Sequence, residues 1–159
     1  MPDEVRLRAA EAGDVEFLRR LYADVRGPEV SAWGWAPAQR DAFLGMQFEA
    51  QRRSYDAAYR DARHEILCVG EVPIGRRIIS ESGEGLLLVD IALLTEWRNR
   101  GIGTRLLREA LEECRTKRCP LRLKVLVGNP AERLYTRLGF VAVDPGQMYT
   151  EMEWKPEGA

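Results

Sequence analysis

The sequence has few of the residues from which metal centres, disulfide frameworks and membrane spans are built. Its 159 residues include one histidine and three cysteines, Cys68, Cys114 and Cys119. An odd cysteine count without metal-ligand spacing argues against a disulfide framework and a zinc site, so we expect reduced thiols, no metal and a cytoplasmic location. No apolar run approaches the roughly 18 residues of a membrane span, and the charged amino terminus lacks the apolar segment of a signal peptide.

The net charge gives no support for a large charged partner, because 24 Lys and Arg residues are balanced by 25 Asp and Glu residues. We therefore expect no binding to nucleic acids or to a membrane. The chain contains no internal repeat, low-complexity tract or linker. Its length favours one domain, 1–159.

The stretch 86–111 predicts a strand, a polar turn and a helix, in that order. Residues 86–94 form a near-continuous apolar run, which is typical of a strand buried on both faces. From residue 102 onward apolar residues recur at spacings of three and four, the period of an amphipathic helix. These are Ile102, Leu106, Leu107, Ala110, Leu111 and Cys114.

The polar turn between that strand and helix has the composition of an anion site. The first amides of a helix have no partner inside the helix, and the helix dipole places partial positive charge at the same end. Gly101 and Gly103 lack Cβ atoms, so an anionic ligand can approach their backbone closely. Arg98 and Arg100 add positive charge, and Thr104 adds a hydroxyl. The turn is therefore predicted to bind a phosphate or a pyrophosphate.

The rest of the chain shows alternating and helical patterns in the order β-α-α-β-β-β-α-β-α-β-β. Residues 15–25 predict a helix that Gly27 and Pro28 end, and residues 37–60 predict one long helix or two. Hairpins are mixed with helical crossovers in this order, which favours an α+β fold or a three-layer α/β arrangement.

Two familiar phosphate-binding patterns do not fit the turn. It has no Gly-Lys-Ser/Thr ending, and Leu106 stands where a dinucleotide-binding turn needs its third glycine. The remaining pattern, Arg98-x-x-Gly101-x-Gly103, resembles the acetyl-CoA pyrophosphate loop of the GCN5-related N-acetyltransferase (GNAT) family. A nucleotide-binding protein stays open as a weaker alternative.

A second segment supports the same resemblance. Residues 129–140, Asn-Pro-Ala-Glu-Arg-Leu-Tyr-Thr-Arg-Leu-Gly-Phe, resemble the carboxyl-terminal signature of that family. The likeness extends over roughly residues 5–155, with the specific motifs confined to 86–140. It implies a GNAT acyl-CoA acyltransferase-like fold, in which helices flank a mixed, mostly antiparallel central sheet.

The resemblance implies acetyl-CoA as co-substrate and gives roles to particular residues. Tyr135 would protonate the departing thiolate as a general acid. Backbone amides at Ile91, Ala92 and Leu93 would pair with the pantetheine arm, and one of them would polarise the thioester carbonyl. Asn129 would contact the same arm. The pyrophosphate would be held by Arg98, Asn99, Arg100, Gly101, Ile102, Gly103 and Thr104.

The sequence departs from the family pattern in two places. Asn129 lies six residues before Tyr135, whereas many members have the asparagine seven residues before the tyrosine, where this chain has Gly128. Leu87 and Leu123 occupy positions at which members often keep a glutamate base. The general base is therefore open.

Three groups could supply the missing base. Asp90 is the nearest acidic residue in sequence and also has a purely structural interpretation as a partner for an amide or an arginine. Glu84 lies upstream, and a water chain could serve instead. Trp33 and Trp35 either line the acceptor site or pack the amino-terminal helices on the sheet.

Two functions of different classes follow from these residues. The first is an enzyme that moves an acetyl group from acetyl-CoA to a primary amine of a small molecule or a peptide, by direct attack in a ternary complex. The second is a non-catalytic acyl-CoA-binding or sensor domain, which the missing glutamates keep open. Many relatives form homodimers, and the residues do not decide whether this chain does.

Overall fold

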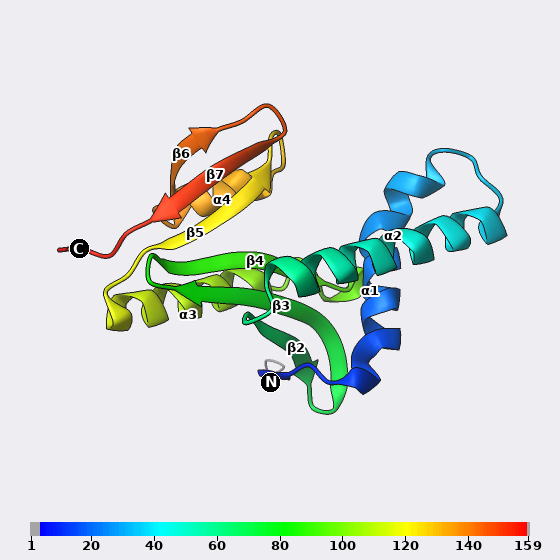
Figure 1. Ribbon diagram of the computed structural model, residues 1–159, viewed down its shortest axis with the longest axis horizontal. Helices are drawn as coiled ribbons and strands as arrows, with labels where there is room; N and C mark the ends of the chain where they lie inside the picture. Colours follow the sequence, from blue (N-terminus) through cyan, green and yellow to red (C-terminus); the bar gives the residue numbers. More distant parts are fainter. Residues whose placement is uncertain (1–3, 159) are drawn as a thin grey trace. The chain divides into compact units, whose positions relative to one another are not determined.

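The computed structural model describes residues 4–158, and within them the chain forms a seven-stranded mixed sheet and four α-helices. The strand order is β1-β2-β3-β4-β5-β7-β6, which confirms the expected α+β fold (Figure 1). Residues 1–3 and 159 lie outside the described residues, and the prediction that the amino terminus is no signal peptide falls partly on them. The strands are β1 Val5–Ala9, β2 Arg63–Val69, β3 Val72–Ser82, β4 Gly85–Leu93, β5 Leu121–Leu126, β6 Val141–Pro145 and β7 Tyr149–Trp154, and the helices are α1 Val15–Ser31, α2 Pro37–Ala58, α3 Ile102–Lys117 and α4 Ala131–Arg137.

The described residues group into two compact units, and the boundary between the units cuts β3 and β4. The first unit contains the chain up to Arg77 together with Ile91–Arg100. The second contains Ile78–Asp90 and the chain from Gly101 onward. The expectation of a single domain stays a prediction.

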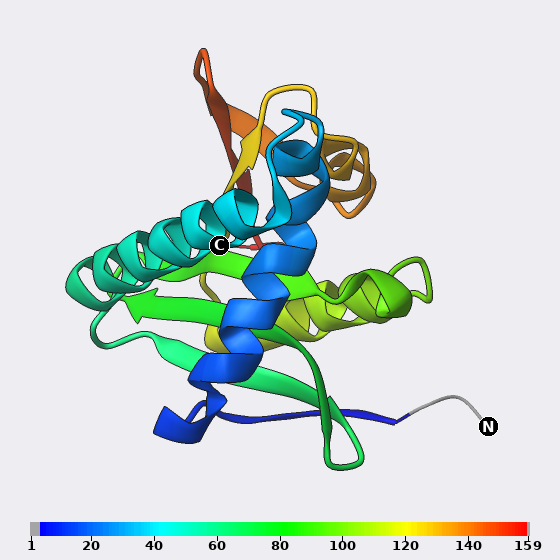
Figure 2. The same cartoon turned by 90° about the vertical axis from the view of Figure 1, so that its right-hand side faces the viewer.

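In the first unit, helix α1 packs on β2. Phe17 and Leu21 of α1 form a buried cluster with Ile66 and Cys68 of β2, and Figure 2 shows α1 lying over that strand. Strand β2 is paired with β1 in antiparallel orientation. The side chains alternate in direction along a strand, so every second residue of β2 can face the helix.

Helix α1 does not end at Gly27 and Pro28, so that prediction is wrong. The helix continues through Pro28 to Ser31. A proline inside a helix removes one hydrogen bond and costs about 3 kcal/mol. The extra turn gains the burial of Val30, which is fully buried against Tyr22 and Leu44, and this packing offsets the local penalty.

Helix α2 is one continuous helix, which settles the alternative between one helix and two. Pro37 stands at its first position, where the missing N–H group costs nothing. Only Leu44 and Phe48 of α2 are buried. The weak helical period of the segment reflects this narrow buried face.

In the second unit, β7 lies between β5 and β6 and is antiparallel to both (Figure 1). Helix α3 connects β4 to β5, which are parallel. A parallel connection needs such a crossover, because the chain must return to the same end of the sheet. The six apolar residues that predicted α3 are all buried: Ile102, Leu106, Leu107, Ala110, Leu111 and Cys114.

Strand β4 is less buried than the sequence predicts. Leu86 and Leu88 are buried, whereas Leu87 and Val89 on the alternate face are only half-buried. The near-continuous apolar run therefore does not mark a strand buried on both faces, and that expectation is wrong. Of the helices in residues 4–158, none combines the length and the apolar character that crossing a bilayer requires.

Candidate active site

The predicted polar turn is formed by a change of backbone direction between β4 and α3. A short 3₁₀ turn, Thr95–Trp97, follows the strand, and Arg98 is extended. Asn99 and Gly101 then adopt left-handed backbone conformations, with φ of 61° and 80°. Asparagine and glycine are the residues that tolerate this region best. Helix α3 begins directly afterwards at Ile102, as the sequence predicts.

The start of α3 is open. A Cβ atom added at Gly101 or at Gly103 would meet no atom within 4 Å apart from its chain neighbours and the backbone of the helix itself. The carbonyl of Gly101 accepts the first intrahelical hydrogen bond, from the amide of Arg105 at 3.0 Å. The turn is therefore not filled by side chains, which is the condition for an anion to reach the helix amides.

The two arginines of the turn are held by neighbouring protein groups. Nε of Arg98 donates a 3.0 Å hydrogen bond to the carbonyl oxygen of Leu93, at the end of β4. The guanidinium carbon of Arg100 lies 4.6 Å from the centre of the Trp97 ring, a cation–π distance. Both positive charges are thus fixed near the backbone of the turn.

Asp24 of α1 also contacts this segment. Its Oδ2 atom accepts hydrogen bonds from the amide of Thr95 at 2.7 Å and from the Thr95 hydroxyl at 2.8 Å. The same oxygen lies 3.8 Å from Nη2 of Arg98. The sequence reasoning missed Asp24, because it is 71 residues from Thr95 and no local pattern marks it.

Strands β4 and β5 share a hydrogen-bonded ladder only over their first residues. The ladder joins Leu86–Leu88 to Leu121–Leu123. β4 then continues to Leu93, while β5 continues to Leu126 with β7 as its partner. The expected amide donors at Ile91, Ala92 and Leu93 thus lie on the part of β4 beyond this ladder.

The end of β4 is packed tightly on β3 at one point. A Cβ atom at Gly75 would lie 2.3 Å from the carbonyl oxygen of Ala92 and 2.9 Å from Cδ2 of Leu93. The amide of Leu94 donates to the carbonyl of Ile74 at 2.9 Å. Only glycine fits at position 75, so this contact fixes the part of β4 that carries the expected amide donors.

The negative charge of Asp90 acts on the phenol of Tyr135. Tyr135 of α4 is half-buried, and its ring centre lies 5.7 Å from that of Phe140. Burial raises the pKa of the Tyr135 phenol, and the nearby charge of Asp90 on β4 raises it further. A phenol with a raised pKa stays protonated at neutral pH, as a proton donor must.

Asn129 is exposed and stabilises the start of α4. Its Oδ1 atom accepts a 2.9 Å hydrogen bond from the amide of Ala131. A shallow hollow next to it is lined by Gly128, Pro130, Arg133 and others. Because the Oδ1 atom of Asn129 already accepts this hydrogen bond, the NH₂ group of the side chain is the part that would donate to a ligand.

The positions of the missing glutamates differ in their surroundings. Leu123 is buried and faces Leu88 across the parallel ladder. Leu87 is half-buried. Glu84, the upstream candidate, is exposed, and its backbone amide donates to the hydroxyl of Ser82 at 3.2 Å. Asp90 is the candidate base whose charge acts on Tyr135.

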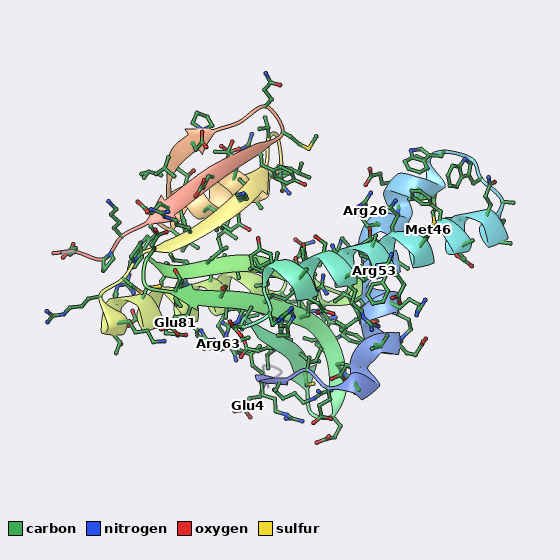
Figure 3. The ribbon with its side chains drawn as sticks, in the orientation of Figure 1. Glu4, Arg26, Met46, Arg53, Arg63 and Glu81 are labelled. Carbon is green, nitrogen blue, oxygen red and sulfur yellow. The ribbon has the colours of Figure 1, made fainter. Side chains whose placement is uncertain are left out.

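Trp33 and Trp35 belong to an aromatic cluster at the connection between α1 and α2. Their ring centres lie 5.1 Å apart, and each also meets Phe43 edge-on, at 5.5 and 5.2 Å. Trp33 remains 47% exposed. Figure 3 labels Arg26 on α1 and Met46 on α2, the two helices that this connection joins. A role for the tryptophans in acceptor binding stays a prediction.

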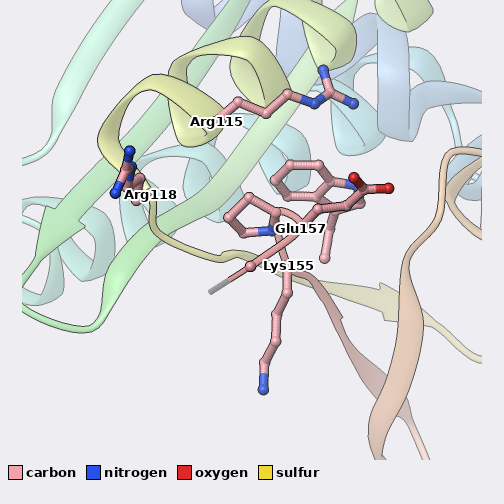
Figure 4. Close-up of a pocket in the computed structure, with 7 residues that line it drawn as sticks. Arg115, Arg118, Lys155 and Glu157 are labelled. Carbon is pink, nitrogen blue, oxygen red and sulfur yellow. The ribbon is translucent and has the colours of Figure 1, made fainter.

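A hollow beyond the end of α3 is a poor candidate for an active site. It is lined by three cationic side chains, Arg115, Arg118 and Lys155, together with Glu157 and Trp154. Figure 4 shows the charged ends of Arg118 and Lys155 pointing in different directions, and the guanidinium of Arg115 lies over the Trp154 ring. The cations do not converge on one ligand position.

Comparison with known sequences decides the family. The profile described as "Acetyltransferase (GNAT) family" matches residues 18–140, more than half of the chain. The chain belongs to the acetyltransferase (GNAT) family. The expected enzyme class, N-acetyltransferase, is thereby confirmed for this GNAT protein. A search of curated proteins finds no match.

Solved structures share the GNAT fold over nearly the whole chain. The PaiA N-acetyltransferase of Thermoplasma acidophilum, crystallised with coenzyme A, is 18% identical, with a TM-score of 0.70 over 96% of this chain and 99% of its own. The ribosomal-protein-S18-alanine N-acetyltransferase of Escherichia coli is 15% identical, with a TM-score of 0.67 over 98% and 96%. At these identities the likeness shows the fold alone.

Proposed function

We propose that this GNAT protein transfers an acetyl group from acetyl-CoA to a primary amine, by direct attack of the amine in a ternary complex. The observation that carries the proposal is the open turn at Gly101 and Gly103, at the start of a helix and directly after two fixed arginines. The pKa of Tyr135, raised by burial and by the charge of Asp90, supports catalysis in addition to binding.

The residues of the turn have a binding role in this proposal. The segment from Arg98 to Thr104 holds the diphosphate of the cofactor through helix amides and positive charge. Amides at Ile91, Ala92 and Leu93 bind the amide-bearing arm as a neighbouring strand would, and Asn129 donates to the same arm. Acetyl-CoA supplies the acetyl group as a thioester when it is bound.

Tyr135 and Asp90 move protons in this proposal. Tyr135 donates its phenolic proton to the departing thiolate. The attacking amine must be neutral, and Asp90, directly or through water, accepts the proton that the amine gives up. An amide of β4 donates to the oxygen on which negative charge develops. The acceptor is an amine of a small molecule or a peptide.

A matched pair of variants at Gly103 tests the diphosphate site. Gly103→Glu and Gly103→Gln add side chains of similar size into open space, and only the first adds negative charge. A carboxylate in the first turn of a helix stabilises the helix by about 0.3–1 kcal/mol. We therefore expect Gly103→Glu to unfold at the same or a higher temperature than Gly103→Gln and to bind CoA at least about tenfold more weakly, because like charges repel.

Calorimetry with CoA and thermal unfolding measure both quantities. Equal CoA affinity in the two variants would show that no anion sits at this helix start. Arg98→Ala provides a second test, since loss of its positive charge is expected to weaken CoA binding. Unchanged affinity in that variant would count against the role of Arg98.

One observation favours a second function, a non-catalytic acyl-CoA-binding or sensor domain. Leu87 and Leu123 leave no carboxylate at the two positions where members often keep a base, and Leu123 is buried. A thiol-release assay over a panel of amines separates the two functions. Tight CoA binding without turnover on any amine would favour the sensor domain.

A further inference from the structure

Polar contacts from α1 to the segment that follows β4 converge on a single carboxylate oxygen. Oδ2 of Asp24 accepts from the Thr95 amide at 2.7 Å and from the Thr95 hydroxyl at 2.8 Å. Arg98 lies 3.8 Å from this oxygen and donates to the Leu93 carbonyl at 3.0 Å. Asp24, Thr95, Arg98 and Leu93 thus form a ring of contacts, which we call the Asp24 clamp.

From this geometry we propose that Asp24 is a positioning residue for cofactor binding, which acts by fixing the backbone between Leu93 and Arg98. The inference rests on the proposed function, because it concerns the segment that enters the diphosphate turn. Asp24 does not touch the cofactor in this proposal. It holds Thr95, the first residue of the 3₁₀ turn, and through it the direction in which the chain leaves β4.

The hydrogen bonds to Thr95 carry more of this role than the ion pair does. Hydrogen bonds to a charged acceptor at 2.7–2.8 Å are among the strong ones in proteins. The Asp24 and Arg98 side chains are 34% and 39% exposed and 3.8 Å apart, so solvent screens their attraction. An asparagine at position 24 keeps an acceptor oxygen for Thr95 and loses only the charge.

If Asp24 acted through its charge alone, its removal would have the opposite effect on CoA affinity. A carboxylate beside the first arginine of an anion-binding turn repels the anion and neutralises part of the arginine's attraction. If charge alone mattered, removal of Asp24 would tighten CoA binding. If the clamp matters more, its removal weakens CoA binding, because the turn then has to be ordered when the ligand binds.

Three variants and a control separate these effects. Asp24→Ala removes the clamp, Asp24→Asn keeps the acceptor, and Thr95→Val removes the hydroxyl donor at constant size. Glu16→Ala is the control, because it removes another carboxylate from α1 whose side chain is 82% exposed. Each full-length protein is measured by calorimetry with CoA, by steady-state acetyl transfer, and by hydrogen exchange of residues 95–98.

We expect Asp24→Ala to raise the Kd for CoA about tenfold, with kcat at saturating acetyl-CoA within about twofold. Asp24→Asn restores most of the affinity, and Thr95→Val falls between Asp24→Ala and the wild type. Amide exchange at residues 95–98 becomes faster in Asp24→Ala, because the Thr95 amide loses its acceptor. Glu16→Ala matches the wild type.

The outcomes distinguish this inference from the proposed function. Faster exchange with unchanged or tighter CoA binding overturns the positioning role and leaves acetyl transfer standing. A wild-type protein that binds no CoA overturns the proposed function itself, and the positioning role falls with it. Should Asp24→Ala fail to fold, Thr95→Val alone decides, and unchanged CoA affinity in that variant overturns the inference.

Discussion

The phenol of Tyr135 on α4 lies within the electrostatic influence of the Asp90 carboxylate on β4. Burial raises the pKa of Tyr135 above its ordinary value of 10.0, and the Asp90 charge raises it further. Two residues 45 positions apart are thus coupled, because the β4–α3–β5–α4 path returns the chain to the same part of the second unit. This coupling yields predictions for each residue.

Tyr135→Phe tests the proton donor. The variant loses the hydroxyl and keeps the ring that packs near Phe140, so we expect CoA affinity within about twofold of the wild type and kcat lowered by about 100-fold or more. Tyr149→Phe is the control, since Tyr149 lies exposed on β7. Equal turnover in Tyr135→Phe and wild type would remove the general-acid role.

Asp90→Asn tests the base and changes the pH profile. As the base, Asp90 is worth about 100-fold or more in kcat, and the variant is expected to lose this with its KM for acetyl-CoA retained. Because Asp90 raises the Tyr135 pKa, we expect the alkaline fall of the residual activity to lie at lower pH in the variant than in the wild type. If the alkaline limb of the pH profile shifts but the maximal kcat is unchanged, Asp90 has only an electrostatic role.

Gly75→Ala tests the contact between β3 and β4. A methyl group at this position would lie 2.3 Å from the Ala92 carbonyl oxygen, so the backbone has to move, and we expect the free energy of unfolding to fall by about 1–3 kcal/mol. Urea denaturation measures this change. CoA binding is expected to weaken too, because the displaced segment contains the amide donors of β4.

Gly45→Ala is the matched control for this substitution. Its added Cβ meets only a side-chain atom of Arg19 at 3.8 Å, inside α2. Alanine is the better helix residue by about 0.5–1 kcal/mol, so this variant is expected to gain stability. Destabilisation of both variants to the same extent would refute the argument from the close contact at Gly75.

Asp14→Ala tests the ion pair at the start of α1. The Asp14 side chain is 10% exposed and accepts two hydrogen bonds from Arg8, at 2.7 and 2.8 Å. Its removal is expected to cost about 1–3 kcal/mol of unfolding free energy, since Arg8 loses its partner. Asp41→Ala, at a carboxylate 71% exposed, is expected to change stability far less.

Acid unfolding tests how the contribution of the Asp14–Arg8 interaction to stability changes with pH. The hydrogen bonds from Arg8 lower the pKa of Asp14 below its ordinary value of 3.8. A lowered pKa in the folded state means that the stabilisation is complete above about pH 4 and is lost as pH falls through the folded-state pKa. Wild type and Asp14→Ala should therefore converge in stability at low pH. A difference independent of pH would contradict this assignment.

The sequence predicted those features that depend on neighbours along the chain. The start of α3 at Ile102 and its buried face follow from the period of apolar residues and from the glycines on either side of Ile102. The pattern Arg98-x-x-Gly101-x-Gly103 identified the family for the same reason. Each of these features is encoded within one short stretch.

Features that depend on distant residues could not be read from the sequence. Helix α1 continues through Pro28 because Val30 finds a buried place against α2, and the apolar run of β4 gave no sign that one face is only half-buried. Asp24 looks like an ordinary surface acid of α1 until its contact with Thr95 is seen. Tertiary packing outweighed local propensity in each case.

The short parallel ladder between β4 and β5 also has a consequence for folding during synthesis. Parallel neighbours separated by a helix form late, since the intervening chain must first fold back. Until Leu121–Leu123 has left the ribosome, Leu86–Leu88 has no parallel neighbour to pair with. A nascent chain at that stage presents an apolar strand edge, which promotes aggregation. Proteins truncated before β5 are therefore expected to accumulate as insoluble material and not as a smaller folded domain.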